Sequence, residues 1–342
     1  MAAPDLYILS LRNLLRVPAM CCVTEFEDVL GATTGAKFVN GAEDISNPAN
    51  AVVFCASIDI YTIESVRPAL LELRRNGARI FLYVFDCWGI ADYYSGRRSG
   101  LKKLLYPRFD LNQIADVVFL PFPEAVADLK RHFAGPMHLV PLGVDTAKTQ
   151  YGARARTIDV MAYGRQPADL MRALSERFNA PSSPRLMYHT DHMNISAITD
   201  IDAHRRQFWA FTAASKIALA YDVRESGGSR AFPYSIVGQR WFECLAAGCV
   251  VAGLRPQTDE TGRLLGWDKA LIDLSPDVPA AIAEIEALLG DTHALHAIGE
   301  RNARETRLRH DWCFRIGDML SAENISLHAR LAERIARQRQ GG

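Results

Sequence analysis

Residues 240–253 read RWFECLAAGCVVAG, a short helical pattern followed by a β-branched run. The change of pattern at Gly248 predicts a helix that turns directly into a buried strand. Glu243 stands in the apolar part of this helix, where a carboxylate needs hydrogen-bond donors. Two interpretations are open: Glu243 binds the hydroxyl groups of a ligand such as a ribose, or it pairs with Arg240, three residues earlier.

On both sides of this stretch, strand patterns alternate with helix patterns along nearly the whole chain. In the first half, a helix with Thr62 as its cap and Gly77 as its end separates two strands, and a second helix covers residues 123–133. Such alternation is typical of parallel sheets in α/β proteins. Strands are predicted at residues 5–10, around Val52, Phe81, Val118 and Leu139, and at 157–164, 185–190, 216–222, 249–254 and 270–274.

The pattern weakens after Asp145 and restarts at Thr157, which predicts a domain boundary. We expect two Rossmann-like domains, residues 1–145 and 146–310, with an interdomain cleft that suits a reaction of two substrates. Residues 311–342 read as helices that cross back to the first domain, with Asp311 as a candidate cap.

The composition excludes several classes of partner. Lys plus Arg and Asp plus Glu number 39 each, so no net charge attracts nucleic acid. The seven cysteines form no C-x-x-C pair, which indicates reduced thiols in a cytoplasmic protein. No apolar run approaches the roughly 20 residues that span a bilayer, and no signal peptide is recognisable.

Four further segments complete an ordered set with FECLAAGCVVAG: QIADVVFLPFPEAVADL (113–129), VPLGVD (140–145), VMAYGRQ (160–166) and RHDWCFRIGDML (309–320). Together they resemble the family-4-like glycosyltransferases of the GT-B type, most closely the subgroup similar to the spore-maturation protein CgeB. The resemblance implies a hexosyltransferase of carbohydrate biosynthesis. Its donor would be a UDP- or GDP-sugar in the C-terminal domain, and it would require no cofactor. The acceptor would be a hydroxyl of a glycan, a lipid-linked sugar or a small molecule in the N-terminal domain, with retention at the anomeric carbon.

The resemblance also implies roles for single residues of the donor domain. Glu243 would bind the nucleotide ribose, and Gly164 and Arg165 would approach the diphosphate. A guanidinium at a strand end can stabilise the charge of a leaving diphosphate, so Arg165 is a candidate catalytic group. The helix start before Trp241 would add its dipole.

Two positions depart from the family pattern. Ser235 stands where the family often has a first glutamate, eight residues before Glu243, and the lysine that usually follows Gly-Arg is absent. Arg224, Arg230 and Arg240 are candidates to replace that cation in the donor site.

Asp86 and Trp88 follow a predicted strand of the first domain, at the edge where ligands bind. Asp86 could orient or deprotonate an acceptor hydroxyl, and Trp88 could stack on a sugar ring. An ordinary capping aspartate and a packed tryptophan are the alternative.

No metal site is expected. Asp200 and Asp202 form a D-x-D motif but precede a helix, so capping explains them better. His189 and His192 lack a third ligand. The basic stretch 95–108 could touch anionic lipid at the inner face of the membrane or hold a phosphorylated acceptor, or it is a solvated helix.

Three other functions fit the same architecture. A catalytically silent relative would bind a nucleotide or a sugar without turnover, as the departures at Ser235 and the missing lysine suggest. A nucleotide-sugar epimerase would need a matched pair of carboxylates, which is not identified. A dehydrogenase is disfavoured because no G-x-G-x-x-G follows the first strand.

Overall fold

The computed structural model describes residues 3–14, 18–94, 110–149, 151–152, 155–190, 198–224, 232 and 234–340. The chain divides into two compact units. The N-terminal unit combines residues 1–143 with 312–340, and the C-terminal unit comprises residues 144–311. Each unit is a parallel sheet with helices packed on it, so the predicted α/β class is confirmed.

The sheet of the N-terminal unit has six parallel strands in the order β2-β1-β3-β4-β5-β6. Strands β3 and β5 are buried along their whole length, which is why they read as continuous apolar runs rather than as alternating ones. The strands are β1 (Asp5–Leu9), β2 (Lys37–Val39), β3 (Ala51–Ser57), β4 (Arg79–Val84), β5 (Val117–Leu120) and β6 (Met137–Leu139).

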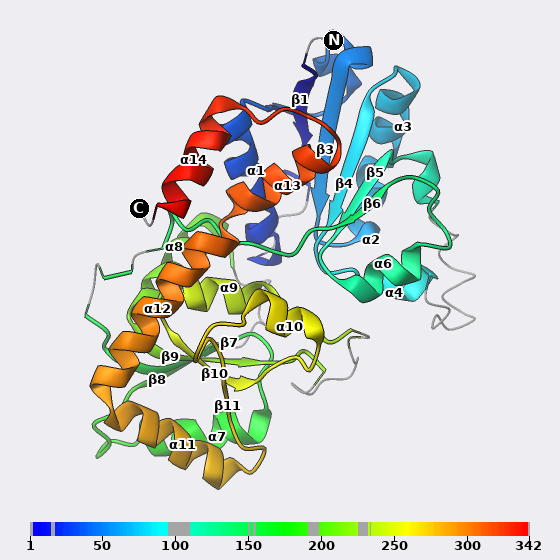
Figure 1. Cartoon of the computed structure of the whole chain (residues 1–342). Coiled ribbons are helices and arrows are strands. Elements are labelled where there is room, and N and C mark those ends of the chain that lie inside the picture. The colour runs from blue at the N-terminus through cyan, green and yellow to red at the C-terminus, as the bar shows by residue number, and fades with distance from the viewer. Residues whose placement is uncertain are drawn as a thin grey trace. The chain divides into compact units, whose positions relative to one another are not determined.

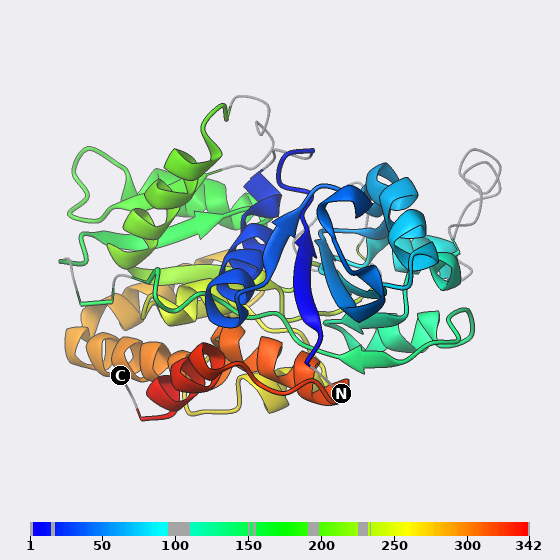
Figure 2. The same ribbon diagram turned by 90° about the horizontal axis from the view of Figure 1, so that it is seen from above.

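Two helices from the C-terminal end of the chain belong to this unit. Helices α13 and α14 both contact α1, as Figures 1 and 2 show. The other described helices and the 3-10 turns of this unit lie between its strands along the chain. The helices are α1 (Cys21–Thr34), α2 (Ile60–Ile63), α3 (Arg67–Arg75), α4 (Trp88–Tyr94), α6 (Pro123–Leu129), α13 (Trp312–Ala322) and α14 (Ala329–Arg339), and the 3-10 turns are η1 (Pro18–Met20), η2 (Ala42–Asp44), η3 (Pro48–Asn50), η4 (Glu64–Val66) and η5 (Leu111–Gln113).

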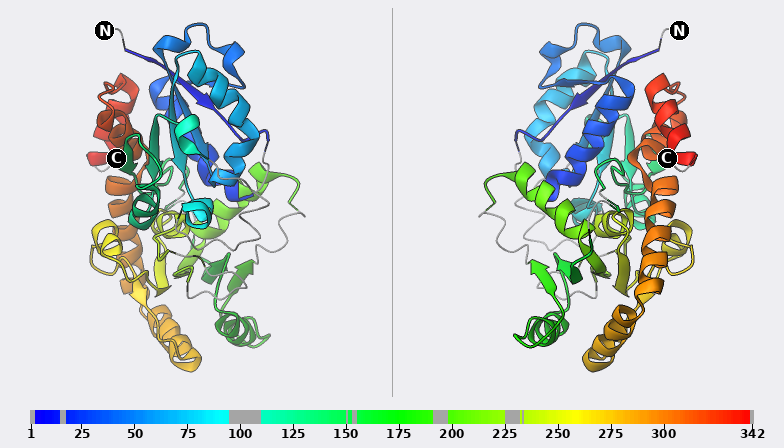
Figure 3. Two further views of the ribbon diagram at one scale, coloured as in Figure 1. Left: turned by 90° about the vertical axis from the view of Figure 1, so that its right-hand side faces the viewer. Right: turned by 90° about the vertical axis from the view of Figure 1, so that its left-hand side faces the viewer.

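The C-terminal unit contains five parallel strands in the order β11-β10-β9-β7-β8. Helices α7, α11 and the start of α12 share one apolar core with β7, β9 and β10, while α8 and α9 contact the same strands separately. Helix α12 contacts α11, and Figure 3 shows these two helices in orange tones in two further views. The elements are β7 (Ile158–Tyr163), α7 (Ala168–Phe178), β8 (Met187–Thr190), α8 (Ile201–Ala213), β9 (Ser215–Tyr221), α9 (Gln239–Ala246), β10 (Val250–Leu254), α10 (Asp259–Leu264), β11 (Ile272–Asp273), α11 (Val278–Gly290) and α12 (Thr292–His310).

The predicted turn between α9 and β10 is confirmed at Gly248. Its φ of 73° is left-handed, and a Cβ there would collide with the ring of Tyr151. Only glycine meets both conditions without strain. The chain can therefore pass from helix to strand within three residues.

The predicted cap at Thr62 is wrong. Helix α2 starts two residues earlier, and the carboxylate of Asp59 accepts from the backbone N–H of Tyr61. A 3-10 turn then interrupts the helix, and α3 starts anew with Pro68 in its first turn. Asp311 lies between α12 and α13, and its Oδ2 accepts hydrogen bonds from the backbone and the hydroxyl of Thr146.

Candidate functional site

The strand order of the C-terminal unit places a topological switch point between β7 and β9. The chain goes from β7 to β8 on one side and then returns to β9 on the other side. Ligands of such sheets bind outside the carboxyl ends of the strands at the switch point. Residues 164–166 follow β7, Asp222 follows β9, and α9 begins at Gln239.

Gly164 and Arg240 lie against one another at this edge. Gly164 has a φ of 65°, and a Cβ on it would collide with the guanidinium of Arg240. Arg240 donates from Nη1 to the carbonyl of Arg165 at 3.0 Å and lies over the ring of Tyr163 at 4.9 Å. The structure thus brings together three residues that sequence reasoning assigned to the donor site.

Gln166 Oε1 and Arg240 Nε are buried at this edge and have no hydrogen-bond partner among the described residues. The amide nitrogen of Gln166 donates to the carbonyls of Tyr163 and Leu219, at 3.1 and 3.0 Å, which fixes the side chain. A buried polar atom without a partner costs about 1–3 kcal/mol. A ligand that supplies an acceptor to Arg240 and a donor to Gln166 would remove this cost.

The start of α9 adds to the attraction for an anion. Its N-cap is Gly238, whose side chain cannot cap the helix, and Arg240 is its second residue. The positive end of the helix dipole and a guanidinium therefore act together. Phosphate oxygens are the groups that such an arrangement prefers.

Glu243 does not pair with Arg240, as one interpretation of the sequence held. Its Oε1 accepts from Arg205 Nη2 at 2.5 Å, and its Oε2 accepts from the Tyr163 hydroxyl at 3.0 Å. Glu243 exposes only 3% of its surface.

Arg205 was not selected by sequence reasoning, because α8 is separated from Glu243 by a strand and a long loop. Its guanidinium lies over the rings of Phe208 and Trp209, at 4.6 and 4.7 Å. Burial raises the pKa of Tyr163 well above its usual value, with further contributions from Cys244 and Glu243. Tyr163 therefore stays protonated and can donate to the carboxylate.

Ser235 brings its hydroxyl to a carboxylate that sequence reasoning also missed. The hydroxyl hydrogen bonds to Oδ2 of Asp222, and the backbone N–H of Arg224 donates to Oδ1 at 3.1 Å. Asp222 is buried, whereas Arg224 is exposed. A polar residue directly after a buried strand is the signal that could have found Asp222. Arg230 lies outside the described residues.

In the N-terminal unit, Asp86 and Trp88 follow β4 and are half-buried. Cys87 between them is fully buried and has a left-handed φ of 57°. Both carboxylate oxygens of Asp59 accept from the N–H of Gly89 at 2.9 Å. Burial raises the pKa of Asp59 to about 6, against the lowering effect of the backbone donors. Because buried contacts hold this turn in place, the backbone that carries Asp86 and Trp88 is fixed.

The switch point of the N-terminal unit lies between β1 and β3. The carboxylate of Glu27 is fully buried nearby, and its Oε2 accepts from Ser10 at 2.6 Å and from Arg12 at 2.9 Å. Its Oε1 has no hydrogen-bond partner among the described residues. Burial raises the pKa of Glu27 to about 7, although Ser10 and Arg12 lower it and Asp28 adds to the rise.

This raised pKa predicts that the N-terminal unit loses stability as the pH rises. Glu27 is protonated in the fold up to about pH 7 but ionises near pH 4.5 when unfolded. Its contribution is complete below about pH 4.5 and falls by about 3 kcal/mol between pH 4.5 and 7, after which no further loss from this group is expected. Denaturant unfolding should show that the free energy of unfolding falls less between pH 5 and pH 8 in Glu27→Gln than in the wild type. The exposed Glu72→Gln serves as control, and equal losses in all three proteins would contradict the prediction.

Four further candidates from the sequence remain: the D-x-D aspartates, His189, His192 and the basic stretch 95–108. Asp200 caps α8 by accepting from the N–H of Ala203 at 2.8 Å, as expected from the sequence. His189 is exposed on β8, while His192 and the basic stretch 95–108 lie outside the described residues. Within the described ranges, no three His, Cys, Asp or Glu residues gather as a metal site would require. None of the helices there has the length and apolar character needed to cross a bilayer.

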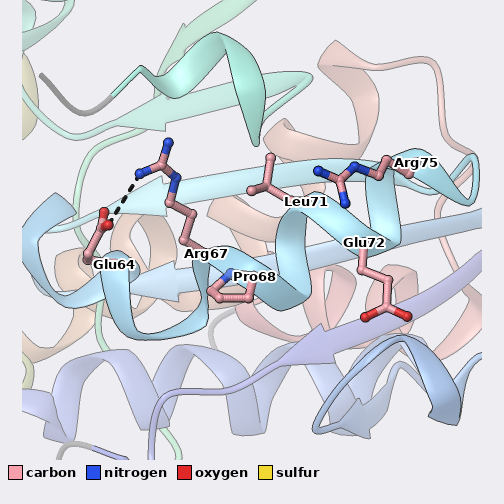
Figure 4. A pocket seen from close by; sticks show the side chains of 6 residues that line it. All are labelled: Glu64, Arg67, Pro68, Leu71, Glu72 and Arg75. Carbon is pink, nitrogen blue, oxygen red and sulfur yellow. Dashed lines mark hydrogen bonds and ion pairs between the residues drawn. The ribbon is translucent and has the colours of Figure 1, made fainter.

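Figure 4 shows a pocket on the surface of the N-terminal unit. All six residues that line it come from η4 and α3, and Arg67 pairs with Glu64 at 3.3 Å. A binding site usually combines side chains from several elements of the fold. This pocket is lined from one short stretch of the chain only. Its lining residues are Glu64, Arg67, Pro68, Leu71, Glu72 and Arg75.

No protein-family model and no curated protein sequence matches the chain. Solved structures do resemble it, and the three described here share 10–12% of its sequence. HepE from Anabaena in complex with UDP has a TM-score of 0.51 at 10% identity, covering 94% of this chain and 99% of HepE. A glycosyltransferase from Rickettsia africae has a TM-score of 0.51 at 12% identity, covering 94% and 97%.

A variant of TarM from S. aureus, in complex with UDP and other ligands, gives a TM-score of 0.54 at 10% identity. The match covers 83% of this chain but only 57% of TarM, so the chain spans little more than half the length of that protein. These neighbours are GT-B glycosyltransferases, and the likeness to them is one of fold. The chain has the GT-B fold of two Rossmann-like units.

Proposed function

We propose that the chain is a glycosyltransferase that moves a sugar from a nucleotide-diphosphate sugar to an acceptor hydroxyl. The C-terminal unit would bind the donor and the N-terminal unit the acceptor. The observation on which the donor site rests is the edge at β7 and β9, where Gly164, Arg240 and the start of α9 lie together. Gln166 Oε1 and Arg240 Nε are buried there and have no hydrogen-bond partner in the part of the chain that the structure describes. An anion with hydrogen-bonding groups on its periphery fits this edge.

The chemical step follows from the charges. The bond between the anomeric carbon and the diphosphate oxygen breaks, and the nucleoside diphosphate leaves with the electron pair. Arg240, Arg165 and the dipole of α9 would stabilise the developing charge. The acceptor oxygen bonds to the anomeric carbon on the face from which the diphosphate leaves, as retention requires. It loses its proton, which Asp86 could take, while Trp88 could stack on the acceptor.

The finer features belong to the same proposal. They are a hexosyltransferase of the family-4-like group, close to the CgeB-like subgroup, with retention and without a required metal. UDP is the first nucleotide to test, because HepE and the TarM variant were each solved in complex with it. GDP follows it. We also propose a cytoplasmic location and a role in carbohydrate biosynthesis, with residues 95–108 as a peripheral membrane contact.

Isothermal titration with UDP, GDP and their sugars tests the donor site. We expect Arg240→Met to weaken binding of the preferred nucleoside diphosphate roughly tenfold to hundredfold, because it removes charge-assisted hydrogen bonds worth about 1.5–3 kcal/mol. Methionine keeps an apolar contact with Tyr163. Arg172→Met, at an exposed arginine of α7, is the matched control and should bind as the wild type does.

Turnover separates the glycosyltransferase from a silent relative. The wild type should slowly release free nucleoside diphosphate from the sugar nucleotide that it binds, and faster with a suitable acceptor. Binding without any release, across a panel of glycan and small-molecule acceptors, would favour a relative that only binds. If the wild type and Arg240→Met bind the nucleoside diphosphate equally, the proposal of an anion site at this edge is wrong.

A further inference from the structure

Asp222 is a carboxylate at the donor edge that has no assigned role. It follows β9 directly, and β9 lies next to β7 in the sheet, so Asp222 stands beside the segment 164–166 that carries the diphosphate candidates. Only 5% of its surface is exposed. The structure therefore holds an acidic group at the switch point, where ligands of this fold bind.

Two segments position this carboxylate. Ser235 hydrogen bonds to Oδ2, and the N–H of Arg224 donates to Oδ1 at 3.1 Å. Ser235 comes from just before α9 and Arg224 from just after β9, so both ends of the connection between them converge on Asp222. Burying a carboxylate is costly, and such a group persists when its remaining acceptor positions meet donors.

Charge decides which part of a nucleotide sugar Asp222 can face. A carboxylate next to a diphosphate would be repelled, and the cationic side of this edge is formed by Arg240 and the start of α9. Sugar hydroxyls donate hydrogen bonds and carry no charge. A buried carboxylate that accepts from them is stabilised instead of repelled.

We propose that Asp222, positioned by Ser235, accepts hydrogen bonds from hydroxyl groups of the transferred sugar and thereby selects the sugar. This inference rests on the proposed function. Because hydrogen bonds have direction, a carboxylate held at two points distinguishes epimers that differ in one hydroxyl. Ser235 acts through Asp222 by fixing the position of Oδ2.

The test compares binding of a sugar nucleotide with binding of its nucleoside diphosphate. Isothermal titration uses UDP with UDP-glucose and UDP-galactose, and GDP with GDP-mannose. In Asp222→Asn, binding of the preferred sugar nucleotide should weaken roughly tenfold, while binding of the nucleoside diphosphate should stay within about twofold. The preference between UDP-glucose and its 4-epimer should shrink. Ser235→Ala should also weaken binding of the sugar nucleotide and reduce the preference between the epimers, but by less than Asp222→Asn does.

The controls distinguish a failure of this inference from a failure of the proposed function. Asp169→Asn, at an exposed aspartate of α7, should bind as the wild type does. If the wild type binds no nucleotide at all, the proposed function fails first. If Asp222→Asn weakens the sugar nucleotide and the nucleoside diphosphate equally, sugar recognition by Asp222 is overturned. If Asp222→Asn weakens binding of the sugar nucleotide only when Mg²⁺ is present, Asp222 binds a cation. That result would also overturn sugar recognition by Asp222.

Discussion

Replacing Glu243 by alanine should lower the free energy of unfolding by about 3–5 kcal/mol, because it leaves a nearly buried guanidinium without its carboxylate. The side chain of Arg205 is only 13% exposed and that of Glu243 only 4%. The hydroxyl of Tyr163 would lose its acceptor in the same change. A loss of nucleotide binding in Glu243→Ala would therefore not distinguish a damaged fold from a missing ligand contact.

Glu243→Gln makes that distinction. Glutamine keeps the volume and one acceptor oxygen for Arg205, so its cost in denaturant unfolding should be clearly smaller than that of alanine. The double variant Arg205→Met/Glu243→Leu should lose less than Glu243→Ala, since neither buried charge remains. If the double variant and Glu243→Ala are equally unstable, the ion pair is not the cause of the loss.

The ribose role of Glu243 stays a proposal that the same variant can test. In the wild type, UDP should bind more tightly than its 2′,3′-dideoxy analogue if a carboxylate accepts from the ribose hydroxyls. Glu243→Gln should reduce that difference while it keeps the fold. An unchanged difference would leave Glu243 with a structural role, as the partner of Arg205 and Tyr163.

The fold was largely predictable because its signals are local. Buried parallel strands such as β3 read as apolar runs, and Gly77 and Gly248 mark turns that need a left-handed backbone. The cap of α2 was missed because Asp59 and Thr62 are both good capping residues. Asp59 also bonds to Gly89, 30 residues away, and sequence spacing does not reveal such a contact.

The site was less predictable because its contacts join distant segments. Arg240 was the natural partner for Glu243 by helical spacing, yet the partner is Arg205, 38 positions away. Arg240 instead turns to Gly164, whose lack of a Cβ makes room for the guanidinium. Asp222 and Ser235 likewise meet across 13 positions. Motifs predicted a site at this edge of the sheet, but side-chain pairing at that edge depends on the folded structure.

Trp312→Ala is the second change from which we expect a large effect, a loss of about 3–5 kcal/mol in the stability of the N-terminal unit. Trp312 is fully buried at the start of α13. Its ring lies 5.4 Å from that of Phe26 and 5.7 Å from that of Phe85, centroid to centroid. Helix α13 comes from the end of the chain, so this aromatic cluster joins it to the core built by the first half.

Trp312→Phe should lower the free energy of unfolding much less than Trp312→Ala does, by about 1 kcal/mol. The Nε1 of Trp312 is buried without a hydrogen-bond partner among the described residues, so Trp312→Phe removes an unsatisfied donor together with some ring contacts. Trp267→Phe is the matched comparison, because Nε1 of Trp267 donates to Asn302 at 2.8 Å and that bond would be lost. Denaturant unfolding followed by circular dichroism should rank Trp312→Phe as the milder of the two. If Trp312→Phe is as damaging as Trp312→Ala, the indole itself, and not an aromatic ring in general, holds α13 on the core.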